Sequence, residues 1–80
     1  MNVKIDVGNV KIDVDINVTV KELLVLCITE SPTTSIRMHV GCFEVEGTAA
    51  SILKCMSREI LDKEVKGIDV ANYRLRIQAN

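Results

Sequence analysis

Residues 2–14 read NVKIDVGNVKIDV, in which the six-residue run NVKIDV occurs twice. Apolar and polar residues alternate in both runs, which is typical of a half-buried β-strand. If the central Gly-Asn pair forms a two-residue turn, Lys4 faces Asp13 across an antiparallel hairpin. Asp6 then faces Lys11. One face of this hairpin is apolar and the other pairs opposite charges, so a slip of one residue would move every valine and isoleucine into water.

The alternation continues beyond the hairpin, because Ile16, Val18 and Val20 keep the phase of the second strand. The sequence therefore predicts that the second strand extends beyond the end of the first. Its part from Asp15 to Val20, which includes Asn17, would be an edge strand able to pair with another sheet.

A helix is predicted from Val20 to Glu30. Thr19 and Glu22 have the spacing of a capping box at its start, and Pro32 disfavours helix in the residue before it. The competing interpretation is a buried strand, because Val25 and Leu26 make the segment apolar on nearly every side. In the helix, these two residues lie outside the main apolar stripe.

A second hairpin is predicted around Gly41. The apolar alternation breaks there, and a two-residue turn at Gly41 and Cys42 restores it. Arg37 then faces Glu46, and His39 faces Glu44. A β-bulge at Gly41 within one longer strand is the alternative.

The remaining residues predict one long helix and a last strand. Thr48 has the residue type of an N-cap for a helix over 49–66, and Gly67 is suited to its C-terminal end. A short link over 68–72 then leads to a strand over 73–79, where apolar residues alternate with polar ones.

These elements predict a single α+β domain over residues 1–80, in the order ββαββαβ. An antiparallel-rich sheet with two helices on one face satisfies all the patterns and gives a two-layer sandwich. The order resembles the β-grasp arrangement of ubiquitin-like domains, which implies a mixed sheet with the last strand parallel to the first. The long second helix and the lack of a di-glycine tail depart from that family, so no conjugation chemistry is implied.

Composition restricts the class of partner. The 80 residues carry a formal net charge of −1, with ten basic and eleven acidic residues interspersed. This balance argues against a broad electrostatic surface for nucleic acid or for an anionic membrane. The three unpaired cysteines and the absence of a basic-then-apolar leader pattern predict a cytoplasmic protein, and no apolar run is long enough to cross a bilayer.

The sequence predicts no enzyme, no cofactor and no metal site. His39 and Cys42 are the most reactive-looking neighbours, but the hairpin places His39 opposite Glu44 and leaves Cys42 at the turn. A second pair of ligands that would complete a tetrahedral metal site is missing. Cys27 and Cys55 fall on the apolar faces of the predicted helices.

Two functions from different classes are considered. The favoured one is a small protein-binding module with either a second copy or another protein as partner, using Val25 and Leu26 or the edge that contains Asp15 and Asn17. Its size and lack of a site resemble the stoichiometric inhibitors and adaptors that phages use against host defence.

The alternative is a nucleic-acid accessory protein or antitoxin-like partner. It would use an arginine-bearing sheet face made by Arg37, Arg74 and Arg76. Phe43 and Tyr73 are expected on the apolar side, so that face offers no aromatic ring for base stacking.

Overall fold

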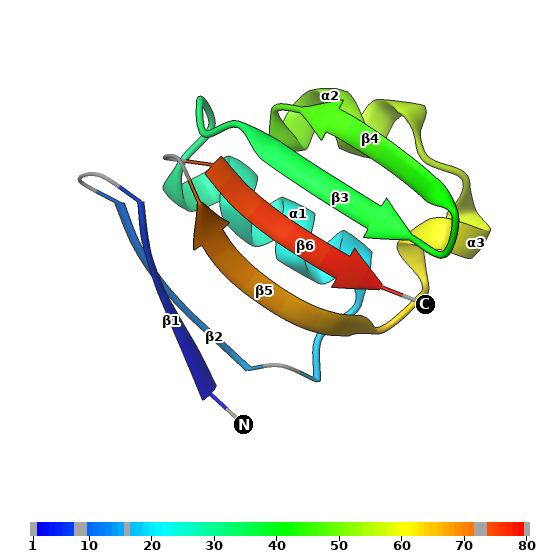
Figure 1. Cartoon of the computed structure of the whole chain (residues 1–80). Helices are drawn as coiled ribbons and strands as arrows, with labels where there is room; N and C mark the ends of the chain where they lie inside the picture. Colours follow the sequence, from blue (N-terminus) through cyan, green and yellow to red (C-terminus); the bar gives the residue numbers. More distant parts are fainter. Residues whose placement is uncertain (1, 8–9, 16, 72–73, 80) are drawn as a thin grey trace.

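The computed structural model describes residues 2–7, 10–15, 17–71 and 74–79. Figure 1 shows a curved sheet with helices behind it and a separate two-stranded hairpin at one side. In chain order the elements are β1 (Asn2–Val7), β2 (Val10–Asp15), α1 (Val20–Glu30), β3 (Ile36–Val40), β4 (Phe43–Gly47), α2 (Ala49–Cys55), α3 (Arg58–Leu61), β5 (Val65–Ala71) and β6 (Arg74–Ala79).

The main sheet has four strands in the order β4-β3-β6-β5. β3 and β6 are parallel in its centre, and the outer strands β4 and β5 are antiparallel to their neighbours. Residues of α1 and α2 share one hydrophobic cluster with β3 and β6 on a single face of the sheet. The protein is thus a small α+β domain with a mixed four-stranded sheet and three helices, and the arrangement is compatible with a two-layer sandwich.

The core lies between the helices and the two central strands. The parallel register sets Ile36 beside Leu75 and Met38 beside Ile77, so every second residue of each strand faces the helices. The described core consists almost wholly of aliphatic residues: Val20, Leu23, Leu24, Cys27, Ile36, Met38, Val40, Ala49, Ile52, Val65, Leu75, Ile77 and Ala79. Packing of α1 onto this layer fixes which of its side chains face outward.

A capping box begins α1. The Oγ1 atom of Thr19 accepts a hydrogen bond from the N–H of Glu22 at 3.2 Å, and the Oε1 atom of Glu22 accepts one from the N–H of Thr19 at 3.1 Å. These bonds pair two amides that the first turn of a helix leaves without partners. The predicted bounds Val20 and Glu30 are confirmed, and the alternative of a buried strand is wrong.

We expect Thr19→Ala to lower the free energy of unfolding by about 1 kcal/mol, because it removes the N-cap acceptor. Denaturant unfolding followed by circular dichroism measures the change. Thr29→Ala is the matched control, because Thr29 lies in the last part of the same helix and its Oγ1 donates only to the carbonyl of Val25 among the described contacts. Equal losses in the two variants would contradict a specific role for the cap.

The hairpin β3–β4 has the predicted register. Arg37 is paired with Glu46 and His39 with Glu44, around a two-residue turn at Gly41 and Cys42. Gly41 has a φ of 60°, which a residue without a side chain adopts at little cost. The alternative of one longer strand with a bulge is therefore wrong.

The hairpin β1–β2 also has the predicted register, with Lys4 opposite Asp13 and Asp6 opposite Lys11. The predicted turn residues Gly8 and Asn9 lie outside the described residues. This hairpin forms a two-stranded sheet of its own, with β1 near β5 and β2 near α1, instead of joining the main sheet.

The predicted edge strand from Asp15 to Val20 is wrong. β2 ends at Asp15, and Asn17 lies in a turn. Thr19 caps α1 and makes only an isolated bridge with Glu64. The capping box competes with strand continuation and prevails, because it satisfies helix amides as soon as Val20 becomes helical. Ile16, which was expected to continue the strand, lies outside the described residues.

The predicted single helix over 49–66 is also wrong. Thr48 caps α2 as expected, but the helix ends at Cys55. Met56 is extended, and the Oγ atom of Ser57 accepts a hydrogen bond from the N–H of Ile60 to start the short helix α3. Serine satisfies helix amides better at an N-cap than in a helix interior, which is the physical reason for the break.

The segment that was predicted as a short link is a strand, β5. Gly67 lies in this strand, at an irregularity between Val65 and Gly67, instead of ending a helix. Val65 and Ile68 are out of phase for a regular strand, and a bulge restores the alternation.

The element order is therefore ββαββααββ instead of ββαββαβ. The parallel contact joins β6 to β3, whereas the β-grasp resemblance implied one between the last and the first strand. Tyr73, expected in the last strand, lies outside the described residues, and β6 begins at Arg74.

Candidate functional site

α1 carries a hollowed surface on the side that faces away from the core. Its inward residues are fully buried, whereas Val25 is 46% exposed. A hollow of about 530 Å³ lies over this outer side. We call its lining the α1 strip, which consists of Lys21, Glu22, Val25, Leu26 and Thr29. These residues follow one another at helical spacing and so form a continuous strip.

Val25 and Leu26 differ in their exposure. Leu26 is half-buried and packs against the core cluster, so only part of it borders the hollow. Val25 is one of the few large hydrophobic side chains that the described structure leaves exposed. The two residues singled out in the sequence are therefore brought together in one surface, with Val25 as its exposed apolar centre.

Asp15 and Asn17 precede α1 in the chain instead of lying on it. Asp15 is the last residue of β2 and is paired with Asn2. Asn17 is exposed in the turn that leads to α1. Both residues precede the capping residue Thr19, and Asn17 is not among the residues that line the hollow over α1.

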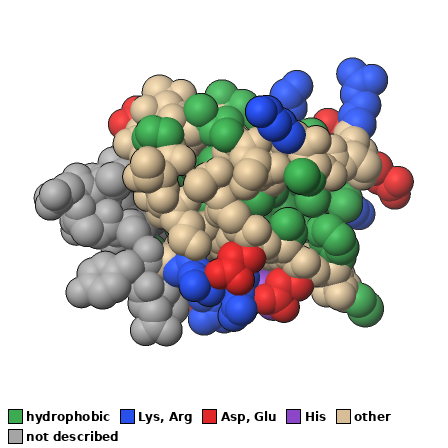
Figure 2. All heavy atoms as spheres, turned by 90° about the horizontal axis from the view of Figure 1, so that it is seen from above, with side chains coloured by type: hydrophobic (Ala, Val, Ile, Leu, Met, Phe, Trp, Pro, Cys, Tyr) green, Lys and Arg blue, Asp and Glu red, His purple; other side chains and the backbone are tan. Residues whose placement is uncertain are grey.

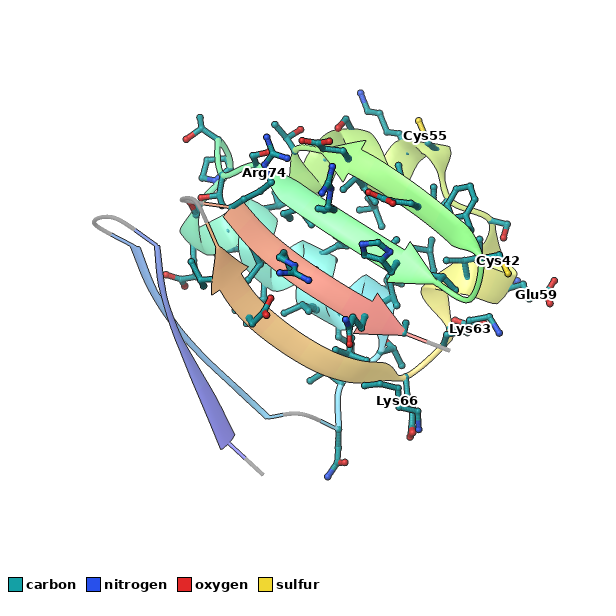
Figure 3. All side chains as sticks on the ribbon, viewed as in Figure 1. Cys42, Cys55, Glu59, Lys63, Lys66 and Arg74 are labelled. Carbon is teal, nitrogen blue, oxygen red and sulfur yellow. The ribbon has the colours of Figure 1, made fainter. Side chains whose placement is uncertain are left out.

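The second group of candidate residues lies on the open face, which is the face of the main sheet that the helices do not cover. Arg37 comes from β3, and Arg74 and Arg76 come from β6. The parallel register places Arg37 directly beside Arg76. Figure 2 shows blue, red and purple side chains gathered along one border of the molecule, and Figure 3 shows Arg74 near the start of β6. The three predicted arginines therefore share one face.

Carboxylates from β4 accompany two of these arginines. The Nε atom of Arg37 lies 2.9 Å from Oε1 of Glu44, and its Nη2 lies 3.7 Å from Oε2 of Glu46. The Nε atom is buried and makes no hydrogen bond, so its contact with Glu44 is an ion pair of poor hydrogen-bond geometry. Arg74 forms an ion pair with Glu46 through Nη1. Glu46 is thus shared by two guanidinium groups.

Asp69 of β5 accompanies the third arginine, with its Oδ1 atom 3.5 Å from Nε of Arg76. All these side chains are about 40% exposed or more, so each pair contributes between zero and about 1 kcal/mol to stability. His39 adds a contact of 3.8 Å from Nδ1 to Oε2 of Glu44. Because carboxylates are interspersed with the arginines, the open face is balanced in charge and does not concentrate positive potential.

Two shallow hollows adjoin this charged row. One of about 160 Å³ is lined by Gly67, Ile68, Asp69, Arg76 and Gln78. The other, of about 350 Å³, is bordered by Gln78, His39 and Lys66. Among the described residues that line these two depressions, no nucleophile lies beside a base. The depressions therefore offer polar contacts to a ligand and no catalytic group.

The thiols are separated in the fold. Cys27 is buried in α1, and burial raises its pKa to about 11, which keeps the thiol protonated. Figure 3 shows Cys42 at the β3–β4 turn and Cys55 at the end of α2, and all three cysteines are free.

Within the described ranges, no three metal-ligating side chains come together, and no helix combines the length and apolarity that a bilayer crossing requires.

Comparison with known proteins gives no relative. No family model matches the chain, and no curated protein or solved structure matches it. The functional argument therefore depends on the surfaces themselves.

One surface was not predicted, namely the outer edge of the main sheet at β4. The sequence does contain the two residues that mark it, Glu44 and Glu46, which alternate with Phe43 and Val45. Their position at an edge follows only from the strand order, because no rule of local spacing says that β6 lies beside β3 and that β4 is then an outer strand among the described residues.

Proposed function

We propose that this chain is a non-enzymatic protein-binding module that docks a partner on the α1 strip. The observation that carries the proposal is the hollow over α1 with Val25 46% exposed at its centre. A protein that binds a partner without catalysing a reaction acts as a stoichiometric inhibitor or as an adaptor. Free thiols are typical of the reducing cytoplasm, so we expect the partner to be a cytoplasmic protein.

The composition of the strip supports the proposal. Val25 and Leu26 supply an apolar centre, and Lys21, Glu22 and Thr29 surround it with polar groups. Apolar cores with polar rims are the usual anatomy of protein interfaces. Because α1 is anchored by its capping box and by four buried residues, the backbone under the strip is already held in place before a partner binds, which lowers the entropy cost of binding.

The arginine-bearing open face supports binding to nucleic acid less well. Arg37, Arg74 and Arg76 each lie within 4 Å of a carboxylate. A phosphate would have to displace or approach those carboxylates, and the release of counterions that drives such binding would be reduced. We therefore assign the proposed function to the α1 strip.

A second copy of the chain is the simplest partner, because a twofold axis across α1 would bring two identical strips together. Size-exclusion chromatography of the wild-type protein with multi-angle light scattering is expected to show a dimer that dissociates on dilution. Val25→Asp is expected to weaken the dimer at least about tenfold, because the new carboxylate would be buried without a partner.

Ala50→Asp is the matched control, because it adds the same charge at an exposed position of α2. It is expected to leave the dimer unchanged. A wild-type protein that stays monomeric at high concentration would rule out the second copy. A dimer that survives Val25→Asp would remove the α1 strip as its interface.

A further inference from the structure

β4 is an open edge of the main sheet. It pairs with β3 on one side, and Figure 1 draws it as the outermost strand on that side. Val40 and Phe43 flank the two-residue turn and therefore form a hydrogen-bonded pair. Bonded and non-bonded pairs alternate along the hairpin, so the N–H and C=O groups of Glu44 and Glu46 point away from β3. Among the described residues, no backbone hydrogen bond from another segment reaches these groups.

The two sides of this edge differ in chemistry. On the open face, the side chains of Glu44 and Glu46 are 46% and 42% exposed. On the opposite face, Phe43 is 44% exposed and Val45 is half-buried. A strand added beside β4 would therefore meet carboxylates on one face and apolar side chains on the other.

A second copy of β4 is a poor occupant of this edge. Antiparallel pairing about a twofold axis at Val45 would set Glu44 of each copy opposite Glu46 of the other. An axis at Glu44 or at Glu46 would set that residue opposite itself. Like charges directly opposite one another destabilise a strand pair, and charged edges are a common protection against such pairing.

We propose that β4 binds an extended segment of another protein in which lysine or arginine alternates with apolar residues. The backbone of the segment would pair with the outward groups of Glu44 and Glu46. Its cations would lie beside the two carboxylates, and its apolar residues would cover Phe43 and Val45. This site does not depend on the α1 strip, so the two proposals can fail separately.

The existing ion pairs leave room for the incoming cations. Each oxygen of the two carboxylates has one such contact: Arg37 and His39 contact Glu44, and Arg37 and Arg74 contact Glu46. Both glutamate side chains nevertheless remain more than 40% exposed. A carboxylate has about four lone-pair sites, so it accepts a further donor from the solvent side.

The test uses a capped seven-residue peptide of alternating valine and lysine, titrated into the ¹⁵N-labelled full chain. We expect chemical-shift changes at the amides of Glu44 and Glu46, and slower hydrogen exchange at both amides once they are bonded. A peptide of alternating valine and glutamate is expected to bind at least about tenfold more weakly, because both charge pairs become repulsive.

Backbone methylation separates strand pairing from simple charge attraction. A valine–lysine peptide that is N-methylated at the amides facing β4 keeps its charge but loses its donors. It is expected to lose binding at least about tenfold. Equal binding of the methylated peptide, or shifts spread over the open face without protection of Glu44 and Glu46, would overturn the proposal.

The protein variant E44Q/E46Q provides a second measurement that keeps the size of both side chains. It is expected to weaken the valine–lysine peptide about fivefold while the shifts still centre on β4. Unchanged affinity in this variant would also overturn the proposal. Val25→Asp is expected to leave peptide binding unchanged, which distinguishes failure at β4 from failure of the α1 strip.

Discussion

Leu24→Ala is expected to lower the free energy of unfolding by about 3 kcal/mol. Leu24 is fully buried in α1, where it belongs to the cluster that packs on β3 and β6. Its truncation removes apolar burial and leaves a cavity, which together cost about 2–5 kcal/mol at such positions. A domain of 80 residues has a total stability of about 4–12 kcal/mol. The variant therefore loses a quarter or more of its stability, which denaturant unfolding measures as a lower midpoint.

Val25→Ala is the matched control for this prediction. Val25 is the next residue in the helix but points outward, and alanine favours helix more than valine does. We expect its stability to stay within about 0.5 kcal/mol of the wild type. Similar losses in the two variants would mean that α1 is rotated on the sheet, and the α1 strip would then not be a surface.

The elements that the sequence predicts correctly are those that local rules determine. In each hairpin, the phase of alternation and the pairing of charges fix one register, and both registers are observed. Thr19 and Glu22 lie three residues apart and form the capping box, so the start of α1 is also local information. Two-residue turns and capping boxes each depend on a few residues close together in the sequence, so local spacing is enough to indicate them.

The second half of the chain shows where local rules compete. The apolar spacing of Ile52, Met56 and Ile60 predicts a continuous helix, but Ser57 is more favourable as an N-cap and divides it into α2 and α3. The residues after Lys63 then form β5, where the irregularity beside Gly67 hides the alternation. At Gly41, the apolar alternation is interrupted by a two-residue turn between two strands. Beside Gly67, it is interrupted by a bulge within one strand. In the sequence both look alike, as an alternation that shifts by one residue.

Strand order is the part that local patterns leave open. Nothing in the spacing of Arg37 and Arg76 indicates that β3 and β6 lie side by side, although both were expected on one charged face. The exposed centre of the α1 strip could be predicted, because Val25 lies outside the apolar stripe of its own helix. The open edge at β4 could not, because an edge is defined by strands that are absent beside it.

The buried thiol of Cys27 is expected to react at least about tenfold more slowly than the exposed thiols of Cys42 and Cys55. Burial raises its pKa from 9.0 to about 11, so its thiolate fraction at pH 8 is about 100-fold lower than at the ordinary value of 9.0. A thiolate of higher pKa is intrinsically more nucleophilic, by about tenfold over this range, and the surrounding core hinders the reagent further. Cys42 and Cys55 are exposed. In native protein treated with an aromatic disulfide reagent, absorbance should report two fast thiols and one slow thiol. In denaturant all three should react together.

The C42S/C55S variant isolates the slow thiol, and its rate should rise steeply with denaturant because reaction requires opening of α1. A fast reaction of this variant in native conditions would contradict the burial of Cys27. The C27A/C42S variant is the control, because it retains only the exposed Cys55 and should react at the fast rate at all denaturant concentrations.

The same thiol should make stability depend on alkaline pH. The unfolded chain releases the Cys27 proton near pH 9, whereas the folded chain holds it until about pH 11. Between these values the unfolded state binds fewer protons than the folded state, so the free energy of unfolding decreases as pH rises. The contribution of the buried thiol to stability is therefore fully present below pH 9 and is lost as the pH rises through 11. The full loss is at most about 2.7 kcal/mol, because the pKa rises from 9.0 to about 11 and each pKa unit is worth about 1.4 kcal/mol. Unfolding measured from pH 8 to 11 in the wild type and in C27A isolates this thiol from other groups that titrate there. Parallel pH profiles would show that Cys27 is not desolvated, because only a thiol buried in the folded state separates the two curves.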